Sequence, residues 1–319
     1  MSFTYTENKV VDCSVSPDLS ILKSKTVVVT GGKFNMALLK RGRTYPELAG
    51  SSGLGAAYVR AFSNAGAQVT IADLNDNPEL TALQGVQFIK CDVRVWSEQL
   101  EAFKSALNQS SNKRIDIVIA NAGIAAIDPV LTIDESEEPQ EPDLRMAEVN
   151  ILGVLYTTKL ALHYFAKSPS PPEEKCLILK SSVAGYLDLP NSAIYQTSKY
   201  AVRGLMCNLR REGRCRVNVV APWFINTPIM SATVIKKLVL AFKAMKSDFA
   251  EVEDSVKAVL RLACDQTING RALGIIPRDR IEAGYVDLEV DDYAKGDLLH
   301  ELLSIAVSVN HRSLFAEDQ

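Results

Sequence analysis

The sequence predicts an α/β fold: one doubly wound parallel sheet with helices on both faces. Short apolar runs alternate with helical patterns along most of the 319 residues. The first run, TVVVT at residues 26–30, is continuous and β-branched, as expected for a strand buried on both faces. Strands that alternate with helices at this spacing are typical of repeated βαβ units, and such sheets bind ligands at the carboxyl ends of their strands.

The expected elements follow one another in a regular series. After the first strand, a helix is predicted from Gly55 through the run AAYVRAFSNAG. Further strands are predicted at residues 68–72, 86–90, 115–120, 175–181, 216–221 and 271–277. Further helices are predicted at residues 97–108, 143–167, 195–211 and 252–264. The series predicts an N-terminal extension, one domain and a C-terminal tail, at residues 1–24, 25–278 and 279–319.

Composition and charge argue against several classes of function. The formal net charge of −3 gives no electrostatic case for binding nucleic acid. The six cysteines form no C-x-x-C pair and do not cluster with the three histidines, so we expect neither a disulfide framework nor a metal site. The N-terminus is too polar for a signal peptide, and no apolar run approaches the roughly 20 residues of a membrane span. A cytoplasmic protein with no membrane span is therefore expected.

Glycine-rich residues lie where the first strand ends and the first helix begins. Glycines are needed where a backbone turns tightly and approaches a pyrophosphate, which the helix N-terminus then holds through its amides. The predicted phosphate-binding residues are Thr30, Gly31, Gly32, Ser52, Gly53, Leu54 and Gly55. Asp73, at the end of the second strand, is placed to accept hydrogen bonds from the adenosine ribose and to repel a 2′-phosphate. The sequence therefore favours NAD over NADP.

A second group of polar residues follows the strand at residues 175–181. Tyr195 and Lys199 are four residues apart and lie on one face of a helix, and Ser182 precedes the tyrosine by thirteen residues. A tyrosine can exchange a proton near neutral pH only if a fixed positive charge lowers its pKa, and Lys199 is placed to supply that charge. Ser182 could then hydrogen-bond the oxygen of an alcohol or carbonyl substrate. These three residues are the predicted catalytic group.

These motifs resemble those of the classical short-chain dehydrogenase/reductase family over about residues 25–277. The resemblance implies a Rossmann fold and a catalytic tetrad of Asn150, Ser182, Tyr195 and Lys199, in which Asn150 anchors a water relay. Lys199 would also hold the nicotinamide ribose. It further implies cofactor contacts from Tyr195, Lys199, Asp92, Val93, Asn121, Gly123, Pro222 and Thr227. Homodimers or homotetramers packed through the helices at residues 143–167 and 195–211 are expected by the same resemblance.

Within the family, the runs VNVVAPWFINTPI and GRALGIIPR are most similar to fungal secondary-metabolite dehydrogenases and the 15-hydroxyprostaglandin dehydrogenase group. This similarity implies NAD-dependent exchange between a secondary alcohol and a ketone on a lipophilic small molecule, such as a polyketide or terpenoid. Apolar residues bracket the expected pocket, namely Leu187, Leu189, Pro190, Trp223 and Phe224. Two interpretations of Trp223 stay open, because the ring could line this pocket or fill core space.

One departure from the family pattern concerns the phosphate loop. Residues 33–50 separate Gly32 from Ser51, and their removal would restore the run TGGSSGLG. The ends of this segment are compatible with a retained intron. We expect a surface excursion, with Gly31, Gly53 and Gly55 still close together. Two alternatives to an NAD-dependent dehydrogenase remain: an NADP-dependent ketoreductase, and a catalytically silent or mis-spliced Rossmann-fold protein.

The helix at residues 195–211 is a second departure, because it reaches the next strand about three residues sooner than is usual in the family. A shorter turn or an altered splice boundary would explain it.

Overall fold

The computed structural model describes residues 5, 7, 9–31, 53–227 and 232–308 of the chain. In this part of the chain, the strands form a single sheet of order β3-β2-β1-β4-β5-β6-β7-β8. Their bounds are β1 Thr26–Thr30, β2 Gln68–Asp73, β3 Val86–Lys90, β4 Ile117–Ala120, β5 Cys176–Lys180, β6 Arg216–Pro222, β7 Ala272–Ile275 and β8 Tyr285–Asp287. All neighbouring pairs are parallel except β7 and β8. The predicted doubly wound α/β fold is confirmed.

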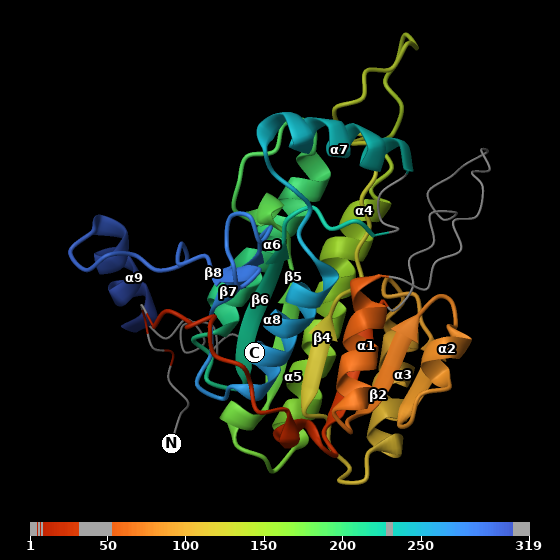
Figure 1. The fold of residues 1–319 in the computed structure, drawn as a ribbon, viewed down its shortest axis with the longest axis vertical. Coiled ribbons are helices and arrows are strands. Elements are labelled where there is room, and N and C mark those ends of the chain that lie inside the picture. Colours follow the sequence, from red (N-terminus) through yellow and green to blue (C-terminus); the bar gives the residue numbers. More distant parts are fainter. Residues whose placement is uncertain (1–4, 6, 8, 32–52, 228–231, 309–319) are drawn as a thin grey trace, which may run out of the picture.

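Helices cover both faces of the sheet (Figure 1). The α-helices described are α1 Leu54–Asn64, α2 Pro78–Thr81, α3 Trp96–Gln109, α4 Arg145–Ala147, α5 Gly153–Lys167, α6 Ala193–Leu209, α7 Ala232–Met245, α8 Val252–Cys264 and α9 Leu298–Ser308. One core cluster joins α1 and α8 to one face of the sheet, and a second joins α3, α5 and α6 to the other.

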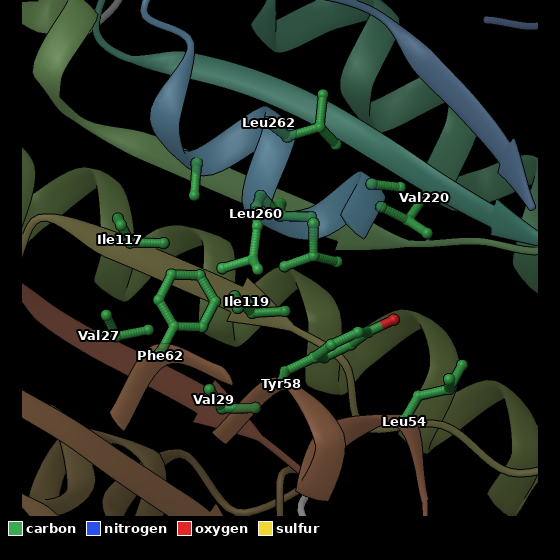
Figure 2. Close-up of a cluster of buried hydrophobic side chains, with 14 of the residues drawn as sticks. Val27, Val29, Leu54, Tyr58, Phe62, Ile117, Ile119, Val220, Leu260 and Leu262 are labelled. Carbon is green, nitrogen blue, oxygen red and sulfur yellow. The ribbon is translucent and has the colours of Figure 1, made fainter. Parts of the chain in front are cut away.

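The strands at the centre of the sheet alternate between the two clusters. Val27 and Val29 of β1 point into the first cluster, and Val28 points into the second. Figure 2 shows the first cluster, where Tyr58 and Phe62 of α1 meet Leu260 of α8 above the strands. Because both faces are covered, a continuous apolar run is required, and this explains why the pattern of β1 was readable from sequence.

The chain crosses from one half of the sheet to the other on its way from β3 to β4, and the switch point lies between β1 and β4, which are hydrogen-bonded neighbours. A sheet wound in two directions leaves a crevice at this switch point, outside the carboxyl ends of its strands. Most of the residues predicted for the cofactor and for catalysis lie at the ends of β1 to β6 or after them, at this edge. Helix α7 lies at the same end of the molecule (Figure 1).

Three features depart from the expected series. β8 pairs antiparallel with β7, so residues 285–287, expected in the C-terminal tail, extend the sheet. Helices α2, α7 and α9 were not predicted. The single helix expected at residues 143–167 is divided into α4, a π-helical stretch Glu148–Leu152 and α5. None of the described helices is long and apolar enough to cross a membrane.

Candidate active site

Ser182 lies two residues beyond the end of β5, at the start of a short 3-10 helix, Val183–Gly185. Its hydroxyl accepts a hydrogen bond from the amide of Ala184 at 3.2 Å and donates one to the carbonyl of Pro222 at 3.2 Å. The two contacts hold Oγ between β5 and β6, at the carboxyl edge of the sheet. The serine is therefore fixed before any substrate arrives.

Tyr195 and Lys199 stand on the first two turns of α6. Tyr195 is half-buried and is hydrogen-bonded to Ser182. Nζ of Lys199 lies 5.4 Å from the centroid of the Tyr195 ring, so the predicted catalytic group is brought together. Nζ of Lys199 also donates to the carbonyl of Lys180 at 3.3 Å. Burial lowers the pKa of Lys199 to about 8.

The electrostatics of Tyr195 differ from the expectation. Burial raises the pKa of the phenol above its usual value, and the hydrogen bond with Ser182 acts in the opposite direction. The positive charge of Lys199 lies over the ring face, where it stabilises the ring electrostatically. Desolvation, which the sequence could not reveal, is the larger effect on the phenol.

Asn150 lies in the π-helical stretch between α4 and α5 and is 1% exposed. Its Nδ2 donates to the carbonyl of Ile124 at 2.9 Å and to Oγ of Ser198 at 3.2 Å. Its Oδ1 accepts from the amide of Ile124 at 2.9 Å. A π-turn inside a helix is frequent at functional sites, since it re-aims a side chain. Asn150 therefore joins the chain after β4 to the catalytic helix α6.

Sequence reasoning missed the residue that caps α6. Oδ2 of Asp128 accepts from the amide of Ile194 at 2.6 Å, and Oδ1 accepts from Val130 at 3.1 Å. A carboxylate at a helix N-terminus satisfies a free amide and is stabilised by the helix dipole. Asp128 precedes Ile194 by 66 residues, so no local pattern reveals the contact.

The glycines predicted for the phosphate loop lie against one another. Gly31 has a φ of +71°, a conformation that favours glycine, and a Cβ on Gly55 would lie 1.9 Å from the Gly31 carbonyl oxygen. Gly53 is the N-cap of α1, and among the residues that the structure describes no side-chain cap hydrogen bond is made to that first turn. The expected closeness of Gly31 and Gly55 is confirmed. Gly32, Ser52 and the segment 33–50 lie outside the described residues.

The polar residues after β2 and β4 surround this junction. Asp73 ends β2 and accepts from the amide of Asn75 at 3.2 Å. Asn121, which follows β4, donates from Nδ2 to the carbonyl of Thr30 at 3.0 Å and to the carbonyl of Gly31. A Cβ on Gly123 would lie 3.3 Å from Oδ1 of Asn150 and 3.5 Å from Nζ of Lys199. A side chain at position 123 would therefore crowd Asn150, and the backbone after β4 passes close to two of the predicted catalytic residues.

The residues expected near the adenine and nicotinamide are also described. Asp92 forms an ion pair with Arg94, with Nη2 of the arginine 2.6 Å from Oδ2. Val93 packs on α5, because a Cβ on Gly153 would lie 2.8 Å from its Cγ2. Pro222 accepts the hydrogen bond from Ser182, and Thr227 is buried just beyond β6. The Asp92 carboxylate is therefore already paired with Arg94 before a cofactor binds.

These residues fit a nicotinamide dinucleotide. The glycine junction leaves no room for a Cβ at Gly55, and the uncapped first turn of α1 can bind a pyrophosphate. Asp73 supplies a carboxylate at the end of β2 and Lys199 an ammonium on α6, groups that can hydrogen-bond ribose hydroxyls.

Trp223 follows β6 and connects the sheet to α7. It packs against the first core cluster, and its ring stacks on Phe242 of α7 with centroids 6.0 Å apart. Phe224 and Phe249 complete an aromatic cluster around Phe242, with centroid distances of 5.7 Å and 5.1 Å. Of the two interpretations left open for Trp223, the one that places its ring in the core is therefore supported by these contacts.

Comparison with known proteins adds independent findings. The family described as short chain dehydrogenase matches residues 48–237. A 5′-hydroxyaverantin dehydrogenase from Dothistroma septosporum is 36% identical and covers 90% of this chain and 94% of its own. A second 5′-hydroxyaverantin dehydrogenase, from Emericella nidulans, is 32% identical over 84% of this chain and 91% of its own. An NADP-dependent dehydrogenase from a Phoma species is 30% identical over 86% of this chain and 81% of its own.

Proposed function

The chain belongs to the short-chain dehydrogenase family and is an oxidoreductase that acts on CH–OH groups. From this premise we propose that it interconverts a secondary alcohol and a ketone on a lipophilic small molecule, with NAD as its cofactor. The observation that carries the proposal is the contact between Ser182 and Tyr195 beneath the ammonium of Lys199.

Each member of the group has a defined task in this proposal. Oγ of Ser182 orients the substrate oxygen, since its position is fixed by Ala184 and Pro222. Tyr195 takes the proton of the substrate hydroxyl during oxidation and returns it during reduction. The nicotinamide, when bound, accepts or supplies the hydride at its C4. Lys199 contributes positive charge, and Asn150 holds the backbone of Ile124 beside α6.

The family implies a nicotinamide cofactor, and we propose NAD rather than NADP. The reason is Asp73, whose carboxylate at the end of β2 would repel a 2′-phosphate. Two relatives are named as NADP-dependent dehydrogenases, and NADP-dependent ketoreduction is therefore the alternative that the experiment below must separate.

The proposed substrate is an apolar molecule that carries a secondary alcohol. Leu187, Leu189 and Pro190 lie between Ser182 and Tyr195 in the chain, and no lysine or arginine lies among them. The names of two relatives refer to 5′-hydroxyaverantin, which supports a hydroxylated product of fungal secondary metabolism. We also propose that the protein forms a homodimer or homotetramer and works in the cytoplasm.

The test is a turnover assay with the purified chain. A panel of lipophilic secondary alcohols is supplied with NAD or with NADP, and formation of the reduced dinucleotide is followed at 340 nm, roughly the usual absorption of this cofactor class. We expect oxidation with NAD and a lower kcat/KM with NADP. Binding of either dinucleotide without turnover of any alcohol or ketone would support a catalytically silent protein. A higher kcat/KM with NADP would support the ketoreductase.

A further inference from the structure

The last residue of β5 is a lysine that contacts two parts of the site at once. Its Nζ donates to Oδ1 of Asn121 at 2.9 Å. Its main-chain carbonyl accepts from Nζ of Lys199 at 3.3 Å. Lys180 therefore lies between the amide that follows β4 and the ammonium on α6.

Asn121 extends the first of these contacts to the phosphate loop. A side-chain amide can present either its oxygen or its nitrogen to a neighbour, but a lysine donor requires the oxygen. With Oδ1 engaged by Lys180, Nδ2 faces the end of β1 and donates to Thr30 and Gly31. The Gly31 carbonyl is also the group that a Cβ on Gly55 would meet. Through Asn121, Lys180 therefore helps to hold the backbone carbonyls of Thr30 and Gly31, where β1 ends beside α1.

The second contact places the half-buried Lys180 next to the buried Lys199. Burial lowers the pKa of Lys180 to about 7, and the like charge of Lys199 acts in the same direction. The neighbouring strands add no opposite charge, because β4 presents the neutral amide of Asn121 and β6 pairs Val220 with Lys180. Burial brings the pKa of Lys199 to about 8. Between these two values the pair holds a single proton.

We propose that Lys180 is a positioning residue of the active site, which holds Lys199 through its carbonyl and the start of the phosphate loop through Asn121. In this arrangement Lys180 loses its charge at lower pH than Lys199, which keeps the positive charge beside Tyr195. The neutral amine still donates its hydrogen bond to Asn121. This inference rests on the proposed dehydrogenase function for its consequence, but its geometry stands without it.

The first experiment separates the hydrogen bond from the charge. Lys180→Met removes both, whereas Lys180→Gln keeps a donor for Asn121 and removes only the titrating amine. We expect Lys180→Met to raise the Kd for the dinucleotide about 3- to 10-fold by calorimetry, because one buried acceptor loses its donor. Lys180→Gln should stay within about 2-fold of the wild type. Lys159→Met, an exposed lysine on α5, is the matched control and should leave Kd unchanged.

The second experiment needs no turnover. The chain is labelled with ¹³C at lysine Cε, and the resonances are followed by NMR from pH 5 to 11, the range about the usual lysine value. We expect two lysines to titrate early, near pH 7 and near pH 8. Lys180→Met should remove the first titration. Lys199→Met should move the first titration to higher pH, because the neighbouring like charge is gone.

The two experiments can fail separately. An unchanged Kd in Lys180→Met overturns the positioning role. A wild type without a lysine that titrates near pH 7, or a Lys199→Met variant in which that titration does not move, overturns the charge relationship. Should Lys180→Met fail to fold, the wild type and Lys199→Met titrations still decide the charge relationship, and a Kd for Lys180→Gln that rises beyond about 2-fold overturns the positioning role, because the donor to Asn121 is retained. If both lysine titrations are observed but no alcohol or ketone is turned over, the result contradicts only the proposed dehydrogenase function.

Discussion

Asn150 and Ile124 are joined by two hydrogen bonds of 2.9 Å, one in each direction. The side-chain amide thereby hydrogen-bonds both the backbone N–H and the backbone carbonyl of Ile124, as a residue on a neighbouring strand would. The third contact of Asn150, to Ser198 at 3.2 Å, connects this backbone to α6 one residue before the catalytic lysine. The π-helical stretch is the local deformation that carries Asn150 to this position.

Replacing Asn150 with alanine should therefore affect both stability and activity. Two backbone groups of Ile124 lose their partners, at a cost of about 1 to 3 kcal/mol for each group that stays buried and unsatisfied. We expect a lower melting temperature and a lower kcat. Leu155→Ala, at an exposed position on the next turn of α5, is the control and should change unfolding free energy by no more than about 0.5 kcal/mol. A stable and fully active Asn150→Ala variant would show that this bridge is dispensable.

The role of Tyr195 is tested by its phenylalanine variant. Tyr195→Phe keeps the ring beneath Lys199 but removes the transferable proton, so kcat should fall by at least about 100-fold. The Kd for the dinucleotide should stay within about 2-fold of the wild type, as measured by calorimetry. Tyr200→Phe, an exposed tyrosine on the same helix, is the matched control. Substantial turnover by Tyr195→Phe would mean that another group carries the proton.

The charge of Lys199 predicts an alkaline limb in the pH profile. A lysine is charged below its pKa, and the pKa of Lys199 is lowered to about 8, so its charge is lost as the pH rises through that value. Burial raises the pKa of Tyr195, so the phenol keeps its proton over the same interval. For ketone reduction, in which Tyr195 donates its proton, we therefore expect kcat/KM to fall as the pH rises from 7 to 9, and Lys199→Arg to displace the fall to higher pH. A flat wild-type profile over this interval would contradict the assignment.

Cofactor preference is expected to depend on Asp73. Asp73→Ala removes both the acceptor for ribose hydroxyls and the repulsion of a 2′-phosphate, so the preference for NAD over NADP should narrow by about 10-fold or more. The measurement is the ratio of kcat/KM values with the two cofactors. Asp76→Ala removes an exposed carboxylate three residues further on and should leave this ratio unchanged. Equal use of both cofactors by the wild type would argue against the role of Asp73.

Deletion of residues 33–50 should retain the fold and tighten dinucleotide binding. Gly31 and Gly55, which flank the segment, are already in contact, so the shortened loop has little distance to span. Ordering a long loop costs roughly 1 to 2 kcal/mol per fixed residue, and exposed lysine contacts contribute about 1 kcal/mol or less each. We expect a higher melting temperature and a lower Kd for NAD. Replacement of residues 33–50 by a Gly-Ser linker of equal length is the control for length alone.

Weaker binding after the deletion would assign the segment a role in holding the cofactor. The retained-intron hypothesis has its own test in the native transcripts. If the dominant message keeps the codons for residues 33–50, the segment belongs to the protein.

The sequence alone determined the parts of this protein that depend on local pattern. The run of valines at Val27 to Val29 predicts a strand buried on both faces, and successive residues of the run do pack into alternate core clusters. The four-residue spacing of Tyr195 and Lys199 predicts a shared helix face, and the structure has both on α6.

Only the tertiary structure decided the relationships that join distant segments. The sequence of β8 is too short to predict whether the strand runs parallel or antiparallel to its neighbour, and its pairing with β7 sets that direction. Asp128 caps α6 across 66 residues, and Lys180 reaches Asn121 across 59. The pKa of Tyr195 is raised because burial outweighs its hydrogen bond with Ser182, and burial is a property of the packed chain. Residue types and spacings determine which polar and titratable groups are available, while packing determines their hydrogen-bond partners and their exposure to water.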